Sequence, residues 1–211
     1  MPFIQESKQL THSTIHFIHY DDFEPAVYLD LLTPEEQERF FSFSNDHRKR
    51  EFVATRYLRH QLFGFEHIHY DPQGAPYIKN EGFISISHTA GIVGIAFNKD
   101  FHIGLDIEIK SEKAQRVRNK FLSEEELILF DHTNSDLMTT AWSAKETLYK
   151  IAGRNKIDFK TELHLQPIKE TIFKGSILTE GIRSSTEIHT FVEDSYVYTI
   201  NESALHIDHT V

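Results

Sequence analysis

The chain has 211 residues, of which 39% are hydrophobic and 26% charged, the balance of a globular protein with one large domain or two small ones. Its formal net charge of −10 argues against general nucleic-acid binding, because a polyanion would be repelled. The absence of cysteine excludes disulfides, thiolate zinc sites and cysteine nucleophiles.

No apolar run approaches the roughly 20 residues that span a bilayer, so we expect no membrane segment. The start of the chain, from Met1 to Glu6, lacks the basic region and apolar core of a secretion signal. We therefore expect a cytoplasmic protein. The 14 histidines are scattered, and surface or hydrogen-bonded roles are the commoner ones, so we favour no histidine metal site.

The first half of the chain predicts two helices and then a sheet. Thr33 precedes a proline and two glutamates, which is the pattern of a capped helix start. Asn45 or Asp46 is expected to cap a second helix that runs to about Phe63 and ends at Gly64. Alternating apolar residues then predict strands at residues 83–87, 92–97 and 101–109.

The turn at residues 98–100 predicts that the last two of these strands form a hairpin. In the second half, Ser123 precedes three glutamates, and Asp136 is the expected cap of a longer helix that ends near Ala152. Four further strands are expected at residues 171–178, 187–192, 196–200 and 204–207. Because each half has helices and an antiparallel hairpin, we predict an α+β fold.

Three carboxylates and a lysine are expected to converge in the second half. Asp106 and Glu108 occupy alternate positions of a strand and therefore project from the same face. On the longer helix, Glu146 lies one turn from Trp142 and from Lys150, away from the apolar stripe. Such carboxylates need a partner or a metal, and Mg²⁺ is typically held by a few carboxylates and substrate phosphates. The alternative is a solvated face with an ordinary Glu–Lys pair.

These segments, read together, resemble a known signature. Gly-Leu-Asp-Ile-Glu from Gly104 to Glu108, followed by Trp-Ser-Ala-Lys-Glu-Thr-Leu-Tyr-Lys from Trp142 to Lys150, resembles the motifs of the 4′-phosphopantetheinyl transferases. These enzymes move the phosphopantetheine arm of coenzyme A onto a serine of a carrier protein. Phe-Leu-Ser-Glu-Glu-Glu, which ends at Glu126, resembles the family element that brings another glutamate to the site.

The resemblance implies that Mg²⁺ is bound against the pyrophosphate of coenzyme A, the co-substrate, by Asp106, Glu108 and Glu146. Lys150, and also Lys145, would neutralise charge that develops on the phosphates. The carrier serine would attack the β-phosphate and release 3′,5′-ADP. Either Glu146 or Glu126 could take the serine proton, and the sequence leaves this choice open.

The resemblance also implies the coenzyme A contacts. Ser87 and His88 match the family's Ser-His motif, although a strand-end turn would explain them equally simply. The second helix of the large family members supplies an arginine to the nucleotide phosphates, and alignment on Arg59 points to Arg50. One departure is Ala75, which stands where the family usually has a lysine or arginine that helps to hold these phosphates.

The length resembles that of the large, surfactin-synthetase-activating members, which are two fused α/β units in a pseudo-dimer. This implies two similar subdomains, at residues 1–99 for coenzyme A contacts and 100–211 for metal binding, in a monomer. The implied partner is an apo acyl or peptidyl carrier protein, as in fatty acid biosynthesis, and such carriers are acidic. A basic stretch beside the metal strand is therefore the predicted docking patch: Lys110, Lys113, Arg116, Arg118 and Lys120.

Two alternatives stay open. A degenerate homologue that binds coenzyme A or carrier protein without transfer is favoured by Ala75, whereas the intact carboxylates and lysines speak against it. An unrelated magnesium phosphohydrolase would use the same carboxylates but would not need the Ser-His motif or the basic stretch.

Overall fold

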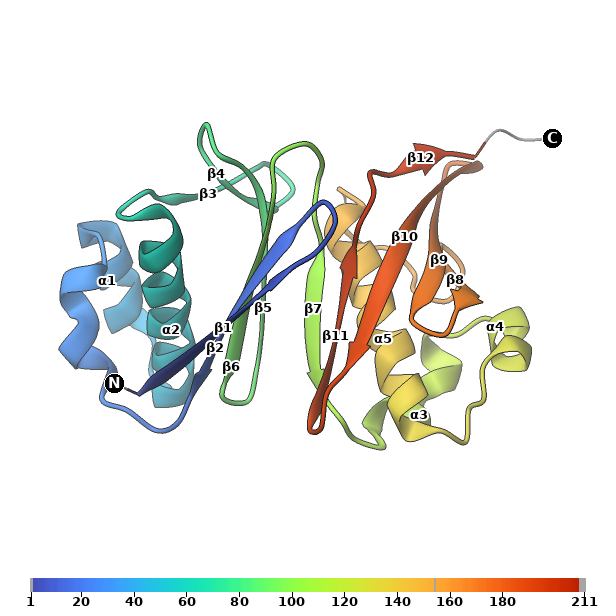
Figure 1. The fold of residues 1–211 in the computed structure, drawn as a ribbon, viewed down its shortest axis with the longest axis horizontal. Coiled ribbons are helices and arrows are strands. Elements are labelled where there is room, and N and C mark those ends of the chain that lie inside the picture. Colours follow the sequence, from blue (N-terminus) through green and yellow to red (C-terminus); the bar gives the residue numbers. More distant parts are fainter. Residues whose placement is uncertain (1, 154, 209–211) are drawn as a thin grey trace.

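The computed structural model describes residues 2–153 and 155–208. Two antiparallel sheets lie side by side in the middle of the molecule, with helices on the outer side of each (Figure 1). The predicted α+β class is confirmed, and the two halves have similar element content. In the described residues, no helix combines the length and the apolar character that a membrane crossing requires.

The first sheet has six strands in the order β1-β2-β6-β5-β4-β3. Their bounds are β1 (Phe3–Gln9), β2 (Thr14–Tyr20), β3 (Ile68–Tyr70), β4 (Pro76–Ile78), β5 (Gly82–Thr89) and β6 (Ile92–Asn98). The helices of this half are the 3-10 helix η1 (Pro25–Leu31), α1 (Pro34–Ser42) and α2 (Asp46–Phe63). The outer face of the sheet packs against α2 through a core that includes Leu58, Ile84 and Ile95.

The predicted helix starts in this half are confirmed. Thr33 accepts a hydrogen bond from the Glu36 amide, and the Glu36 carboxylate accepts one from the Thr33 amide, which completes a capping box. Asn45 caps α2 by accepting from the His47 amide. Gly64 follows α2 with a φ of 61°, a conformation that glycine adopts readily.

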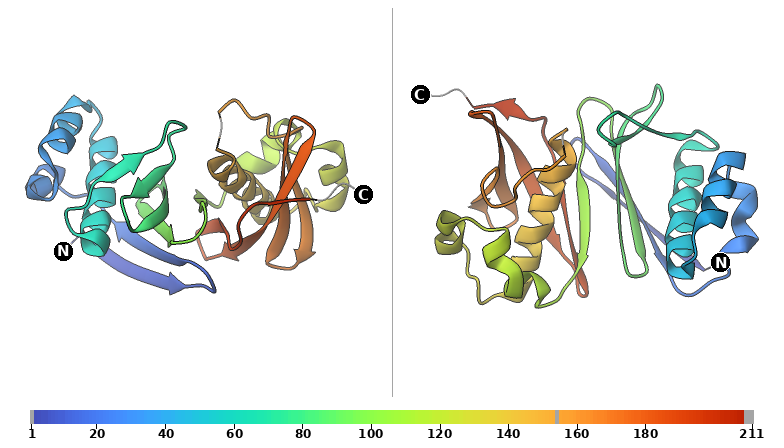
Figure 2. Two further views of the ribbon diagram at one scale, coloured as in Figure 1. Left: turned by 90° about the horizontal axis from the view of Figure 1, so that it is seen from above. Right: turned by 180° about the vertical axis from the view of Figure 1, so that it is seen from behind.

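The second sheet runs β7-β11-β10-β9-β8, with β12 added on β10. Its bounds are β7 (Leu105–Ile109), β8 (Leu163–Lys169), β9 (Ile172–Thr179), β10 (Ile182–Val192), β11 (Tyr196–Asn201) and β12 (His206–Ile207). The helices are α3 (Lys113–Val117), the 3-10 helix η2 (Arg118–Lys120), α4 (Glu124–Leu129) and α5 (Ser135–Ile151). The long helix α5 covers the outer face of this sheet, as the views of Figure 2 show.

Two sequence predictions are corrected. The cap of α5 is Asn134 and not Asp136, because the Asn134 side chain accepts from the amides of Asp136 and Leu137. The predicted hairpin between residues 92–97 and 101–109 does not form, because β7 pairs with β11 of the other sheet. The Asn201 side chain holds the connecting segment there by accepting from the Gly104 amide.

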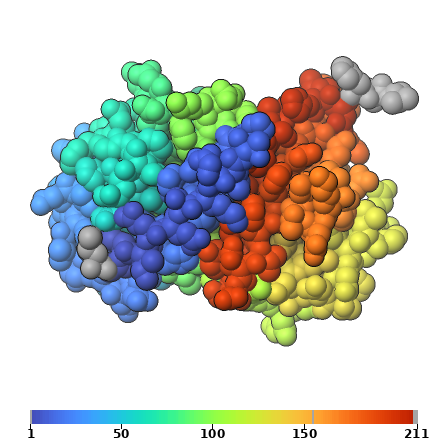
Figure 3. Space-filling view, in the orientation of Figure 1, coloured from blue at the N-terminus to red at the C-terminus, as the bar shows by residue number. Residues whose placement is uncertain are grey.

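The two sheets meet through an apolar core built from β2, β6, β7 and β11, which includes Phe17, Ile107 and Tyr198. Gly94 permits the close approach, because a Cβ atom there would lie 2.7 Å from Cδ1 of Ile107. The β1–β2 hairpin also reaches across the junction, and Lys8 donates to the Tyr198 hydroxyl at 2.8 Å. Figure 3 shows this hairpin (blue) against the C-terminal strands (red).

Candidate active site

Four charged residues meet where α5 crosses β7. Asp106 and Glu108 alternate along β7, and Glu146 and Lys150 lie one turn apart on α5. The Nζ of Lys150 donates to Oδ1 of Asp106 at 2.9 Å and to the Leu105 carbonyl at 2.6 Å. The structure thus brings together the residues that the sequence predicted as metal ligands and the second lysine of the helix motif.

The carboxylates of this cluster are crowded and partly desolvated. Burial, followed by the charge of Asp106, raises the pKa of Glu146 to about 7. The same two causes, in the same order, raise the pKa of Glu108. The indole Nε1–H of Trp142 partly opposes this shift by donating to Oε1 of Glu108 at 2.8 Å. In the described part of the chain, Lys150 and the more distant Lys113 are the lysines that act on these three acids, so negative charge is in excess at the site.

The two carboxylate oxygens of Asp106 lie in different surroundings. Oδ1 accepts from Lys150 and from the Ser87 hydroxyl, the latter at 3.3 Å. Oδ2 is buried and has no hydrogen-bond partner. A buried carboxylate oxygen without a partner is costly, so the geometry of Asp106 suits a cation that would bind at Oδ2.

Within residues 2–153 and 155–208, no three acidic, histidine or cysteine side chains are already arranged to hold a metal ion. The donors that converge here nevertheless fit a hard divalent cation of the Mg²⁺ type. Mg²⁺ keeps several waters and commonly takes only one or two carboxylates directly, with substrate phosphates completing its shell. The free Oδ2 of Asp106 and the raised pKa of Glu146 are what such a partly open site predicts.

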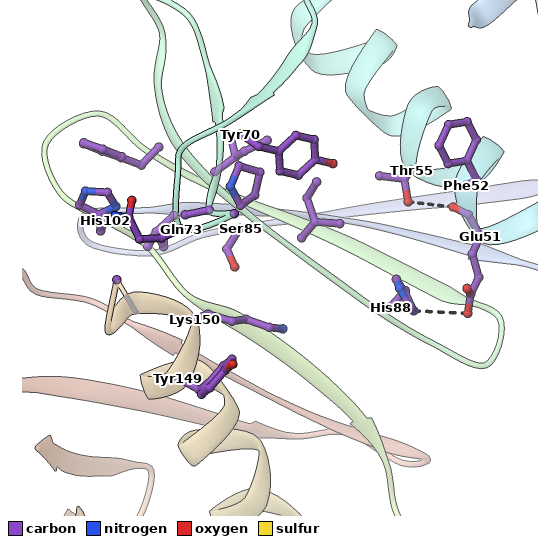
Figure 4. A pocket seen from close by; sticks show the side chains of 18 of the residues that line it. Glu51, Phe52, Thr55, Tyr70, Gln73, Ser85, His88, His102, Tyr149 and Lys150 are labelled. Atoms are coloured by element: carbon purple, nitrogen blue, oxygen red, sulfur yellow. Dashed lines mark hydrogen bonds and ion pairs between the residues drawn. The ribbon is translucent and has the colours of Figure 1, made fainter. Parts of the chain in front are cut away.

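A pocket of about 350 Å³ lies between the two halves next to this cluster. Figure 4 shows Tyr149 and Lys150 of α5 on one side, and Glu51 and His88 of the first half on the other. Among the described residues, the basic side chains that line the pocket are Arg39, Arg48, Arg56, His88, His102 and Lys150. Arginine, histidine and lysine donors around one cavity suit phosphate groups.

His88 is held between two charged residues of α2. Its Nδ1 lies 3.3 Å from Oε1 of Glu51, and its Nε2 lies 3.2 Å from an Nη atom of Arg48. Because Arg48 must donate, Nε2 accepts and Nδ1 carries the proton in this arrangement. Partial burial lowers the pKa of His88, with Glu51 opposing the shift. An anion in the pocket would therefore meet the positive charge of Arg48 and an imidazole whose neutral form is favoured by burial.

Arg50 does not reach the pocket. Its Nε donates to the Phe23 carbonyl at 2.9 Å, and its guanidinium pairs with Asp22. Residues two apart on a helix are rotated by about 200°, so Arg48 and Arg50 face opposite sides of α2. The helical period could have distinguished the two arginines, since Arg48 lines the pocket and Arg50 does not.

Lys145 and Glu126 also lie away from the carboxylate cluster. The Nζ of Lys145 is fully enclosed and donates to Glu126 at 2.7 Å and to the carbonyls of Phe121, Phe159 and Leu163. Glu126 is 2% exposed, caps α4 through the Ser123 amide, and accepts from the Leu165 amide at 2.7 Å. This pair ties α4, α5 and β8 together, and neither side chain is open to a substrate.

Ser87 and Ala75 lie at the two margins of the site. The Ser87 side chain is buried between the sheets and contacts Asp106, whereas the next residue along β5, His88, lines the pocket. Ala75 lines the pocket from the loop between β3 and β4, where its amide donates to Asp71 at 2.8 Å. Residues 71–75 of this loop carry no basic side chain, and Arg39 of α1 and Arg48 and Arg56 of α2 are basic residues that line the same pocket.

Comparison with known proteins points to one class. Residues 102–201 match the model of the 4′-phosphopantetheinyl transferase superfamily. The matched segment runs from just before β7 to the end of β11 and contains Asp106, Glu108, Glu146 and Lys150. This half therefore carries a domain of that superfamily, whose general chemistry is phosphopantetheine transfer. No curated protein matches the chain.

Proposed function

We propose that the protein is a magnesium-dependent 4′-phosphopantetheinyl transferase, a holo-[acyl-carrier-protein] synthase. It transfers the arm of coenzyme A to a serine of an apo acyl or peptidyl carrier protein. The observation that carries this proposal is the convergence of Asp106, Glu146 and Lys150 at the edge of a pocket lined by Arg48 and His88. Acidic groups for a cation and basic groups for phosphates thus adjoin one cavity.

The reaction breaks one phosphoanhydride bond. The carrier serine Oγ attacks the β-phosphorus of coenzyme A, a new phosphoester bond forms, and 3′,5′-ADP leaves. The serine proton passes to a carboxylate, and Glu146 suits this role because it is only partly buried and lies beside Asp106 and Lys150. Glu126 does not suit it, since both of its oxygens are engaged in buried hydrogen bonds.

Mg²⁺ bound by Asp106, Glu108 and Glu146 would supply charge stabilisation at the pyrophosphate. The chain itself contributes Lys150, whose ammonium would move from Asp106 toward the phosphates when they arrive. Trp142 fixes the orientation of Glu108 through its indole N–H. The remaining phosphate contacts fall to Arg48 and His88, with Ser87 behind them between the sheets.

The division of labour follows the two halves. In our proposal, residues 1–99 provide most coenzyme A contacts and residues 100–211 provide the metal ligands, in a cytoplasmic monomer of the large, surfactin-synthetase-activating type. The similar element content of the two halves and the pocket between them support this arrangement. A single chain then completes the site without a second copy.

The carrier protein is proposed to dock beside Glu108. Lys113 is exposed and close enough to lower the pKa of Glu108, so it marks the near edge of this surface. Two of the five basic residues are already paired, Lys110 with Asp136 at 2.9 Å and Arg116 with Glu112 at 2.6 Å. The charge left for an acidic partner therefore comes mainly from Lys113, Arg118 and Lys120.

The deciding experiment incubates the protein with coenzyme A, Mg²⁺ and an apo carrier protein, and follows masses. A carrier that gains one phosphopantetheine arm, with 3′,5′-ADP released, supports the proposal. Coenzyme A that binds without any change in mass supports the non-catalytic homologue that Ala75 favours. Cleavage of coenzyme A without modification of the carrier supports a phosphohydrolase. Asp106→Ala is the matched negative control.

A further inference from the structure

Two serines of β5 join the two sheets. The Ser85 hydroxyl accepts from the Leu105 amide at 2.8 Å, and the Ser87 hydroxyl accepts from the Ile107 amide at 3.1 Å. The strands β5 and β7 belong to different sheets, and β7 forms its ladder with β11 on its other side. Side-chain oxygens thus satisfy the amides on the open edge of β7, where a neighbouring strand would supply carbonyls.

Only one of these serines also reaches a carboxylate. The Ser87 hydroxyl donates to Oδ1 of Asp106 at 3.3 Å, on the same oxygen that accepts from Lys150. Ser85 is also a buried serine with the same kind of amide contact, but it lines the pocket and does not contact Asp106. The chain therefore contains its own matched control for the role of Ser87.

The two contacts on Oδ1 set the rotation of the Asp106 carboxylate. With Oδ1 held by Ser87 and Lys150, the second oxygen, Oδ2, is buried without a partner. An oxygen that is desolvated and unpaired is the stronger candidate to bind a cation, because binding there removes an existing cost. Lys150 is also expected to leave Oδ1 when phosphates arrive, after which Ser87 is the remaining donor to that oxygen.

We propose that Ser87 is a positioning residue for the cation site. Its hydroxyl orients Asp106 so that Oδ2 faces the bound divalent cation. This inference rests on the proposed function, in which Asp106 is a metal ligand. Groups that hydrogen-bond a metal ligand commonly change metal affinity about 10–100-fold when they are removed. Because His88 follows Ser87 on β5 and lines the pocket, one strand also sets the position of the cation relative to coenzyme A.

The test measures Mn²⁺ binding by electron paramagnetic resonance in the presence of saturating coenzyme A. We expect Ser87→Ala to weaken Mn²⁺ binding about 10–100-fold. Ser85→Ala should keep an affinity close to that of the wild type, and Ser87→Thr, which retains the hydroxyl, should keep most of it. Amide hydrogen exchange checks that both alanine variants lose their contact to β7, at Ile107 and at Leu105 respectively.

The outcomes separate this inference from the function on which it rests. Wild-type protein that binds Mn²⁺, with Ser87→Ala binding as tightly as Ser85→Ala, overturns the role of Ser87 and leaves the transferase proposal intact. Wild-type protein that binds no Mn²⁺ with coenzyme A overturns the metal site and the inference together. If Ser87→Ala does not fold, Ser87→Cys replaces it with the same expectation, because a thiol is a weak donor and acceptor of similar size.

Discussion

The ammonium of Lys150 lies 2.9 Å from Oδ1 of Asp106 and joins α5 to β7 at the centre of the carboxylate cluster. It is the only cation in hydrogen-bond contact with that carboxylate in the described residues. A divalent cation bound to Asp106 would therefore affect Lys150 strongly, because both positive charges would lie beside the same carboxylate. The charge of Lys150 competes with a metal ion for Asp106 and, in the proposed reaction, serves the phosphates.

Replacing Lys150 should consequently change the affinities for coenzyme A and for a divalent cation in opposite directions. We expect Lys150→Met to weaken coenzyme A binding and to lower transfer by about 10²–10³-fold, the scale of losing one charge-stabilising donor. Mn²⁺ binding in the absence of coenzyme A should become tighter, because a competing cation is removed. Steady-state kinetics and paramagnetic titration measure the two effects. Lys169→Met, at an exposed position of β8, is the control. Unchanged coenzyme A affinity would contradict the proposed role.

The shifted pKa of Glu146 gives a stability test for metal-free protein. Burial and Asp106 raise its pKa from 4.5 to about 7, so between these values the folded state holds a proton that the unfolded state has lost. Stability due to this group is therefore complete below pH 4.5 and falls as the pH rises through 7. We expect Glu146→Gln to be more stable than the wild type at pH 8, by about 1–2 kcal/mol after solvent screening.

Urea unfolding at pH 4.5 and pH 8 in a chelator measures this difference. Added Mg²⁺ should reverse it for the wild type at pH 8, since a bound cation stabilises the ionised carboxylate. Glu146→Gln should respond less to Mg²⁺ at either pH. If the two proteins show the same pH slope without metal, the crowding of carboxylates around Glu146 is not a feature of the folded protein in solution.

The two arginines on opposite faces of α2 should differ in their effects. Arg48 lines the pocket, so Arg48→Ala should raise the KM for coenzyme A by about tenfold or more, as expected for a lost charged contact of about 1.5–3 kcal/mol. Arg50 pairs with the exposed Asp22, and Arg50→Ala should cost less than about 1 kcal/mol of stability and leave this KM unchanged. The reverse result would support Arg50 as the arginine that binds coenzyme A.

The basic surface beside β7 is expected to govern the encounter with the carrier. Reversing Lys113 and Arg118 to glutamate should raise the KM for the carrier and leave the KM for coenzyme A nearly unchanged. Salt should mimic the effect in the wild type, because the Debye length falls from about 10 Å at 0.1 M to about 3 Å at 1 M. The double variant Lys99→Glu/Lys169→Glu, at two exposed positions outside this surface, controls for net charge. A selective loss of coenzyme A affinity would place these residues in the cofactor site instead.

Local signals in the sequence predicted the helices well. Capping chemistry depends on a few adjacent residues, so the starts at Thr33, Asn45 and Ser123 could be read directly. The strands β1 and β2 were not predicted. Of β1 only Phe3 is buried, so this strand lacks the alternating apolar pattern that marks a half-buried strand.

The pairing of strands that lie far apart in the sequence was harder to predict. The turn at residues 98–100 suggested a hairpin, but the partner of β7 is β11, which lies far along the chain. The clustering of Asp106 and Glu108 followed from the strand period alone, whereas their approach to Glu146 depends on how α5 packs. The period also places Lys145 about 100° around the helix from Glu146, where tertiary packing turns it into the core.

For Lys145, the role implied by the family resemblance and the role indicated by its contacts in the structure differ, and this difference can be tested. The resemblance implies that it contacts coenzyme A, whereas its ammonium is enclosed with Glu126 and three carbonyl oxygens. Burial lowers the pKa of Lys145, and Glu126 opposes the shift. We expect Lys145→Met to lower the free energy of unfolding by about 3–5 kcal/mol, because a buried carboxylate loses its partner.

The double variant Lys145→Met/Glu126→Gln should regain part of that loss, because the unpaired charge is removed as well. Urea unfolding of the wild type, the single variants and the double variant measures this coupling. The fraction of Lys145→Met that stays folded at low temperature should show kcat and KM for coenzyme A close to those of the wild type. A strong rise in this KM in fully folded protein would instead place Lys145 in contact with the phosphates during turnover, and would require its enclosing shell to open.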